Sequence, residues 1–82
     1  MLKAKAVGTA KVYVPTKRRT TLEPSKVAEI AESILEKGQT TPILVREDGE
    51  RFVLVEGLHR LEACRSLGEE TILAYIVQAR RH

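Results

Sequence analysis

The clearest pattern in the chain is an apolar stripe at helical spacing. Between Pro24 and Lys37, apolar residues recur three, four, seven and eight positions after the first, as on the buried face of an amphipathic helix; they are Val27, Ile30, Ala31, Ile34 and Leu35. Pro24 suits the first turn of a helix, and Gly38 suits the position just past its end. The pattern therefore predicts a helix from Pro24 to Lys37.

Short apolar runs bounded by turn residues predict the strands. Residues 9–14 alternate in part and contain β-branched side chains before a proline that ends the run. Residues 41–46 and 51–56 flank an Asp-Gly pair, which is typical of a hairpin turn. The continuous apolar run at 71–78 predicts a strand that is covered on both faces.

A second helix follows the strand at 51–56 almost directly. Leu61, Cys64 and Leu67 share one face and Gly68 is a natural stop, so we expect a helix from about Leu58 to Leu67. The thiol of Cys64 lies on this apolar face, and we expect it to be buried and structural.

The predicted order of elements is β-α-β-β-α-β, with a polar, basic loop at residues 16–22. This is an α/β (α+β) fold with one mixed sheet and two main helices. No repeat or long linker divides the chain, so we expect a single domain over residues 1–82, with its core at about 9–79 and basic ends at 1–8 and 79–82.

The net charge of +3 is distributed unevenly. The first 19 residues hold six basic side chains and no acidic one, whereas residues 20–79 have a net charge of −5. Basic ends on an acidic body attract nucleic acid without sequence preference. The alternative is that the ends serve only solubility or are a cloning remnant.

Other features exclude several classes of protein. No apolar run approaches the roughly 18 residues that a membrane span needs. The N-terminus lacks the apolar core of a signal peptide, and one cysteine cannot form an internal disulfide. We therefore expect a cytoplasmic protein.

The turn between strand 51–56 and the second helix has the chemistry of an anion site. Gly57 permits a sharp turn or a close backbone approach, and the N–H groups at a helix start are unpaired. His59 and Arg60 add side-chain donors, so we expect the turn to bind a phosphate, and His59 is also suited to proton transfer. The alternative is a solvated helix start whose side chains cap it or pair with Glu56 and Glu62.

Lys26 lies in the first turn of the first helix, where a cation is unfavourable to the helix dipole, and this hints at a nearby anion. The alternative is an ordinary exposed lysine.

Two segments together resemble the ParB/sulfiredoxin superfamily, over roughly residues 9–79. One is the helix Glu-Pro-Ser-Lys-Val-Ala-Glu-Ile-Ala-Glu-Ser-Ile, followed by Lys-Gly-Gln-Thr-Thr-Pro-Ile up to residue 43. The other is Val-Glu-Gly-Leu-His-Arg-Leu-Glu-Ala at residues 55–63. ParB proteins usually carry Gly-Glu-Arg-Arg in this second box, and sulfiredoxins carry Gly-Cys-His-Arg.

The resemblance implies a nucleotide site. In this superfamily the Gly-x-[His/Arg]-Arg turn binds the phosphates of ATP or CTP, which makes Gly57, Leu58, His59 and Arg60 the implied phosphate-binding residues. Mg²⁺ is left open as a companion of the nucleotide, and no metal held by the protein alone is expected.

Three further positions match nucleotide contacts of the superfamily. Lys26 and Ser33 match a lysine and a hydroxyl that sulfiredoxins place near the nucleotide, and Arg19 matches an arginine that precedes the first helix of ParB. Glu29 stands where a serine is usual, which is a departure from the sulfiredoxin pattern.

Two other departures separate the chain from its better-known relatives. Leu58 occupies the position of the catalytic cysteine of sulfiredoxins, and Cys64 lies nearly two helical turns further on, so repair of a sulfinic acid is disfavoured. The chain also stops after its last strand without a helix-turn-helix, so it carries no element for reading a DNA sequence.

The leading hypothesis is a module that binds ATP or CTP in a DNA-associated setting, either partition or transcription regulation, with a homodimer left open. The runner-up is a phosphotransferase, ATPase or nuclease of the same superfamily, with Glu56, Glu29 or His59 as the candidate catalytic groups. The third is a protein-interaction domain without a nucleotide.

Overall fold

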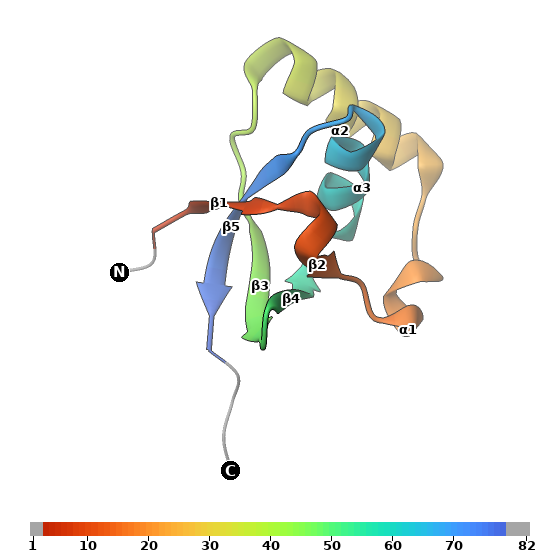
Figure 1. Ribbon diagram of the computed structural model, residues 1–82. Helices are drawn as coiled ribbons and strands as arrows, with labels where there is room; N and C mark the ends of the chain where they lie inside the picture. Colours follow the sequence, from red (N-terminus) through yellow and green to blue (C-terminus); the bar gives the residue numbers. More distant parts are fainter. Residues whose placement is uncertain (1–2, 79–82) are drawn as a thin grey trace.

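The computed structural model describes residues 3–78, without the side chains of residues 18 and 19. It contains one five-stranded mixed sheet and two main helices (Figure 1), which confirms the predicted fold class. In chain order the elements are β1 (Lys5–Gly8), the 3₁₀ turn η1 (Thr9–Lys11), β2 (Val12–Tyr13), α1 (Thr16–Arg19), α2 (Pro24–Lys37), β3 (Ile43–Asp48), β4 (Arg51–Glu56), α3 (Leu58–Ser66) and β5 (Thr71–Val77).

The strand order in the sheet is β1-β5-β3-β4-β2. Strands β3 and β4 form the predicted antiparallel hairpin, in which Asp48 pairs with Arg51 and Gly49 takes a positive φ of 65° in the turn between them. Strand β5 runs parallel to β3 after the crossover through α3, and antiparallel to β1. The parallel β3–β5 pair makes the sheet mixed and places α3 next to it.

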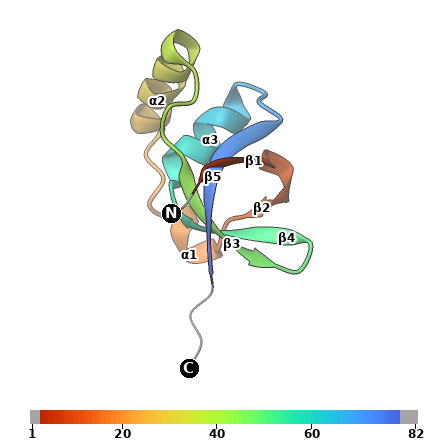
Figure 2. The same ribbon diagram turned by 90° about the vertical axis from the view of Figure 1, so that its left-hand side faces the viewer.

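Helices α2 and α3 contact each other and lie together on one side of the sheet, as the two views in Figures 1 and 2 show. The apolar stripe of α2 packs against a core formed by α3 and the inner face of the sheet. The predicted bounds of α2 are confirmed. Leu35 is the exception in the stripe, because it is 73% exposed, so the buried face of α2 is narrower than the pattern indicated.

The N-terminal strand is corrected by the structure. The predicted strand at 9–14 is interrupted, because residues 9–11 form a 3₁₀ turn and the strands lie on either side of it. The Thr9 N–H donates to the carbonyl of Glu70 at 3.0 Å, and the Thr9 hydroxyl donates to the carbonyl of Glu69 at 2.9 Å. These long-range bonds hold residues 9–11 out of the strand conformation. The chain therefore leaves one edge of the sheet after β1 and joins the opposite edge as β2.

Two smaller predictions are also corrected. Residues 16–19 of the predicted loop form a single helical turn, after which the Thr20 hydroxyl donates to the carbonyl of Lys17 at 2.9 Å. Strand β5 is not covered on both faces: Ile72 and Ala74 are buried, whereas Leu73, Tyr75 and Val77 on the other face are partly exposed.

The side-chain amide of Gln39, four residues before β3 begins, hydrogen-bonds to the backbone of β5. Gln39 accepts from the Leu73 N–H at 2.8 Å through Oε1 and donates to the carbonyl of Thr71 at 3.0 Å through Nε2. The amide therefore pairs with the start of β5 as a strand residue would, and it anchors the chain between α2 and β3.

Arg65 holds the interrupted N-terminal segment against α3. Its Nη2 donates to the carbonyls of Thr9 at 2.9 Å and Val12 at 2.7 Å, and its Nη1 donates to Glu62 Oε2 at 3.3 Å. The two carbonyl contacts explain why the chain can leave the strand conformation at η1 while these carbonyls stay paired.

Replacement of Arg65 with alanine is expected to lower the free energy of unfolding by about 2 kcal/mol, because two charge-assisted bonds to carbonyls are lost. Urea denaturation followed by circular dichroism measures this. Glu62→Gln is the matched control: it removes only the partly buried ion pair, at 3.3 Å, and is expected to cost less than about 1 kcal/mol. Equal losses in the two variants would show that the ion pair, and not the carbonyl contacts, holds the segment.

Among the helices that the structure describes, none is both long enough and apolar enough to cross a membrane.

Candidate functional site

The turn between β4 and α3 requires glycine for two reasons. Gly57 caps α3 with φ 112° and ψ 33°, a backbone conformation that L side chains rarely adopt. A Cβ at this position would lie 2.5 Å from Ile43 Cγ2 and 2.8 Å from Ile43 Cβ, so the turn also packs directly against β3. The backbone of the turn is therefore held in one place by the start of β3.

The first turn of α3 presents unpaired donors. No side chain caps this helix. Its first backbone hydrogen bond is donated by the Leu61 N–H to the Gly57 carbonyl, at 3.0 Å. The N–H groups of the preceding residues remain available to an anion.

Arg60 contributes the most informative atom of the site. Its side chain is partly buried, and Nη1 is fully buried without a hydrogen-bond partner in the described part of the chain. A buried donor without a partner costs free energy, and the cost is larger for a charged group. Arg60, in the first turn of α3, thus carries a donor whose hydrogen-bonding capacity is unused by the described residues.

His59 connects the two helices. Its Nε2 accepts a hydrogen bond from the backbone N–H of Glu23 at 2.9 Å, and Glu23 is the N-cap of α2. The start of α2 and the start of α3 therefore meet at this ring, and their positive dipole ends add there. Because a neutral imidazole has one donor and one acceptor nitrogen, Nδ1 carries the proton. In this arrangement Nε2 is occupied and His59 offers a donor rather than a base.

The candidate residues on α2 make no hydrogen bond or ion pair with the Gly57–Arg60 turn in the described part of the structure. Lys26 is exposed in the first turn, and its Nζ lies 3.0 Å from Glu23 Oε2 in a surface ion pair. Ser33 is partly buried and lies seven residues further on, on the same side of the helix about 10 Å along its axis. Glu29 lies between them and is exposed.

The remaining candidates lie at the margin. Glu56 ends β4 directly before the turn and is exposed. Arg19 ends α1, and its side chain lies outside the described part of the structure. In residues 3–78 no three His, Cys, Asp or Glu side chains gather closely enough to hold a metal ion.

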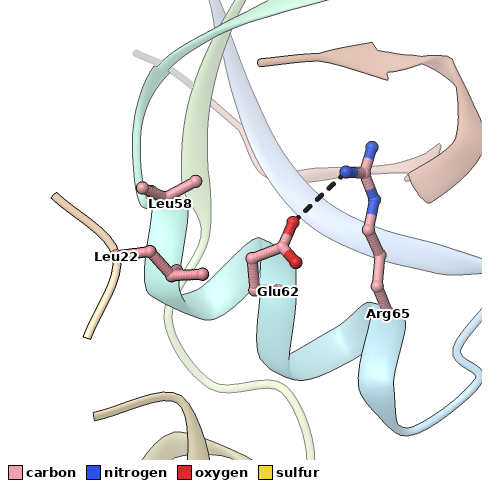
Figure 3. Close-up of a pocket in the computed structure, with 4 residues that line it drawn as sticks. All are labelled: Leu22, Leu58, Glu62 and Arg65. Carbon is pink, nitrogen blue, oxygen red and sulfur yellow. Dashed lines mark hydrogen bonds and ion pairs between the residues drawn. The ribbon is translucent and has the colours of Figure 1, made fainter. Parts of the chain in front are cut away.

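Leu58 is not exposed in the turn but belongs to the core, at 8% exposure. With Leu22, Glu62 and Arg65 it lines a cavity of about 330 Å³ beside the first turns of α3 (Figure 3). The two leucines form one end of this cavity, and the Glu62–Arg65 pair forms the other. The contributions of Leu22 and of the Glu23 N–H were missed from the sequence, since both depend on where α2 begins relative to α3.

Cys64 is completely buried, as predicted. Burial raises the pKa of its thiol above the usual value, and the charge of Glu69 acts in the same direction, while the Arg60 guanidinium opposes them. The thiol is therefore held in its neutral form, which is unreactive as a nucleophile.

The fold and the turn together define a member of the ParB/sulfiredoxin superfamily. The family model of the ParB N-terminal domain matches residues 5–82, and the chain belongs to this family. The curated relatives include a probable chromosome-partitioning protein ParB of Campylobacter jejuni, 37% identical over 62 residues, and a probable chromosome 1-partitioning protein ParB of Deinococcus radiodurans, 44% identical over 50 residues. These alignments cover 76% and 61% of this chain but only 22% and 17% of the relatives, so the chain spans about a fifth of their length.

Solved structures with the same fold come from both branches of the superfamily. Sulfiredoxin from Arabidopsis thaliana is 30% identical, with a TM-score of 0.81 over 96% of this chain and 86% of that one. A C-terminally truncated ParB from Caulobacter crescentus, complexed with CTP-γ-S, is 23% identical, with a TM-score of 0.82 over 95% of this chain and 46% of that one. A variant of a free serine kinase in complex with AMP is 18% identical, with a TM-score of 0.75 over 90% of this chain and 30% of that one.

Proposed function

We propose that this domain is a nucleotide-binding module that holds the phosphates of CTP or ATP at the Gly57–Arg60 turn. The observation that carries the proposal is the buried Nη1 of Arg60, a cationic donor without a partner at an uncapped helix start. A phosphate group satisfies such a donor and is favoured by the helix dipole. The Nδ1–H of His59 and the N–H groups of the first turn supply further donors.

Similar proteins support a nucleotide as the source of the phosphate. The ParB of C. crescentus was solved with CTP-γ-S, and the serine kinase with AMP and, in another structure, with ADP. Each of them shares the fold of this chain. The choice between CTP and ATP, and any need for Mg²⁺, is decided by measuring binding of each nucleotide with and without the metal.

Other residues have supporting roles in the proposal. Lys26 and Ser33 line the side of α2 along which the rest of the nucleotide would extend, and Arg19 is proposed as an additional cation. Because the curated relatives are partition proteins, the setting we propose is cytoplasmic and DNA-associated, in partition or transcription regulation. Binding, orientation and charge neutralisation of the phosphates are the tasks of these residues.

A thermal-shift screen of CTP, ATP, GTP and UTP, each with and without Mg²⁺, tests the proposal. A ligand that binds only the folded protein raises the free energy of unfolding by RT ln(1 + [L]/Kd), which is about 2.7 kcal/mol at a ligand concentration of 100 times Kd. We expect CTP or ATP to raise the melting temperature, whereas inorganic phosphate at the same concentration should have a smaller effect. No shift with any of the four nucleotides would contradict the proposal.

A further inference from the structure

A second cavity lies at the edge of the sheet, away from the first turn of α3. It has a volume of about 380 Å³ and is lined by residues 10–14 of the η1–β2 segment together with Arg51 and Arg65. Three of its lining residues are cationic, one is aromatic and none is acidic; these are Lys11, Arg51, Arg65 and Tyr13. We call this cavity the β2 groove.

Both arginines of the β2 groove are held in position by the protein. The Arg51 guanidinium stacks over the Tyr13 ring, 4.3 Å from its centroid, and its Nε donates to Asp48 Oδ2 at 3.1 Å. Arg65 is fixed by the carbonyls of Thr9 and Val12. Figure 3 shows the Arg65 side chain extending from α3 toward the η1–β2 segment. Because these side chains are already ordered, a ligand would immobilise them at little further cost in entropy.

The fixed arginines still have donors to spare. A guanidinium has five N–H groups, and the bonds of Arg51 use only the one on Nε. Arg65 uses three, two on Nη2 and one on Nη1. Lys11 is exposed beside them and takes no part in an ion pair among the described residues. The groove thus offers fork-shaped donors and an exposed ammonium, which are the groups that contact phosphates along a nucleic-acid backbone.

The charge pattern of the chain favours the same ligand. Five of the seven lining residues lie in the N-terminal segment, whose first 19 residues contain no acidic side chain. Acidic side chains are exposed on α2 and, beside Arg51, in the β3–β4 hairpin; they are Glu29, Glu32 and Glu36 on α2, and Glu47, Asp48 and Glu50 in the hairpin. Asp48 and Glu62 pair with the two arginines and reduce the net charge, so the expected affinity is that of sequence-independent binding.

We infer that the β2 groove binds the phosphodiester backbone of nucleic acid through Lys11, Arg51 and Arg65. The inference extends the DNA-associated part of the proposed function. The Gly57–Arg60 turn contributes no residue to the groove, and Arg65 is the one residue that the groove shares with the cavity beside Leu58.

Fluorescence anisotropy with labelled single-stranded and duplex oligonucleotides, over a range of salt concentration, tests this inference on the 82-residue chain. Lys11→Gln and Arg51→Gln are each expected to weaken binding about 3-fold or more and to lower the slope of log Kd against log salt by about 1. The matched control is Lys37→Gln, which removes the same charge from the exposed last turn of α2. This control should leave the slope unchanged.

The variants distinguish a site in the β2 groove from a general effect of net charge. Equal losses in Lys11→Gln and Lys37→Gln would overturn the inference, because only net charge would then matter. Absence of binding to both oligonucleotides would overturn it as well, and displacement of the oligonucleotide by millimolar inorganic phosphate would assign the groove to a free anion. Saturating CTP or ATP should not displace the oligonucleotide. The thermal-shift screen is a separate measurement. If no nucleotide binds, the anisotropy data still test whether the β2 groove binds nucleic acid.

Discussion

Replacement of Arg60 with glutamine is expected to weaken nucleotide binding on the order of 100-fold, as measured by isothermal titration calorimetry with whichever of CTP and ATP binds the native chain. The physical reason is that Nη1 is a buried cationic donor with no partner among the residues that the structure describes. A phosphate at the start of α3 would supply that partner, and glutamine lacks both the charge and the fork.

The stability of the free protein distinguishes a ligand-binding arginine from a structural one. Because Nη1 makes no hydrogen bond, Arg60→Gln should leave the melting temperature of the free chain unchanged or raise it. A structural arginine would instead lose partners and destabilise the fold, as expected for Arg65→Ala. Unchanged affinity in a folded Arg60→Gln variant would remove the turn as the phosphate site.

Two controls accompany this measurement. Arg60→Lys keeps the charge but not the planar fork, so it should recover only part of the affinity. Arg46→Gln removes a partly buried arginine from β3, three residues beyond the Ile43 that packs on the turn, and should leave the affinity unchanged.

Replacement of Gly57 with alanine is expected to cost at least about 3 kcal/mol of the free energy of unfolding. The positive φ contributes about 1–2 kcal/mol, and forcing a methyl group into a packed contact adds about 1–3 kcal/mol. The new Cβ would lie 2.5 Å from Ile43 Cγ2 and 3.3 Å from Ile43 Cα. The backbone of β3 cannot rotate away as a flexible side chain could, so the turn itself must shift.

Gly68→Ala is the matched control for this prediction. Gly68 also has a positive φ, 74°, but a Cβ there would meet nothing within 4 Å. The control should therefore lose only the backbone contribution, about 1–2 kcal/mol. Urea denaturation of both variants measures the difference, and equal losses would mean that the close packing on Ile43 carries no energetic weight. A shifted turn should also weaken nucleotide binding in any Gly57→Ala protein that remains folded.

The elements with local determinants were predicted from the sequence to within two residues; the largest difference is in β3, which begins and ends two residues later than the strand predicted at 41–46. Helix α2 has an apolar stripe, a proline in its first turn and a glycine after its end, and its bounds match the prediction. The β3–β4 hairpin and α3 are likewise specified by an Asp-Gly pair, an apolar face and Gly68. These signals act within a few residues of the chain, so they do not depend on contacts with distant elements.

The N-terminal segment could not be predicted in the same way. Residues 9–14 have the composition of a strand, but other hydrogen bonds replace those that one continuous strand would make to its neighbours. Thr9 bonds to the backbone of Glu69 and Glu70. Arg65 bonds to the carbonyls of Thr9 and Val12. The partners are more than 50 residues apart in the chain, and no local pattern indicates them.

By itself, the sequence was enough to identify the family, the fold class and the Gly57–Arg60 turn as the candidate site, because glycine, a helix start and cationic side chains are adjacent in the chain. Only the tertiary structure decided what each residue does there. It placed Leu58 in the core, occupied Nε2 of His59 with the start of α2, and left Arg60 Nη1 buried without a partner. The reason is physical: a side chain's chemistry is set by its burial and its partners, and these come from elements distant in sequence.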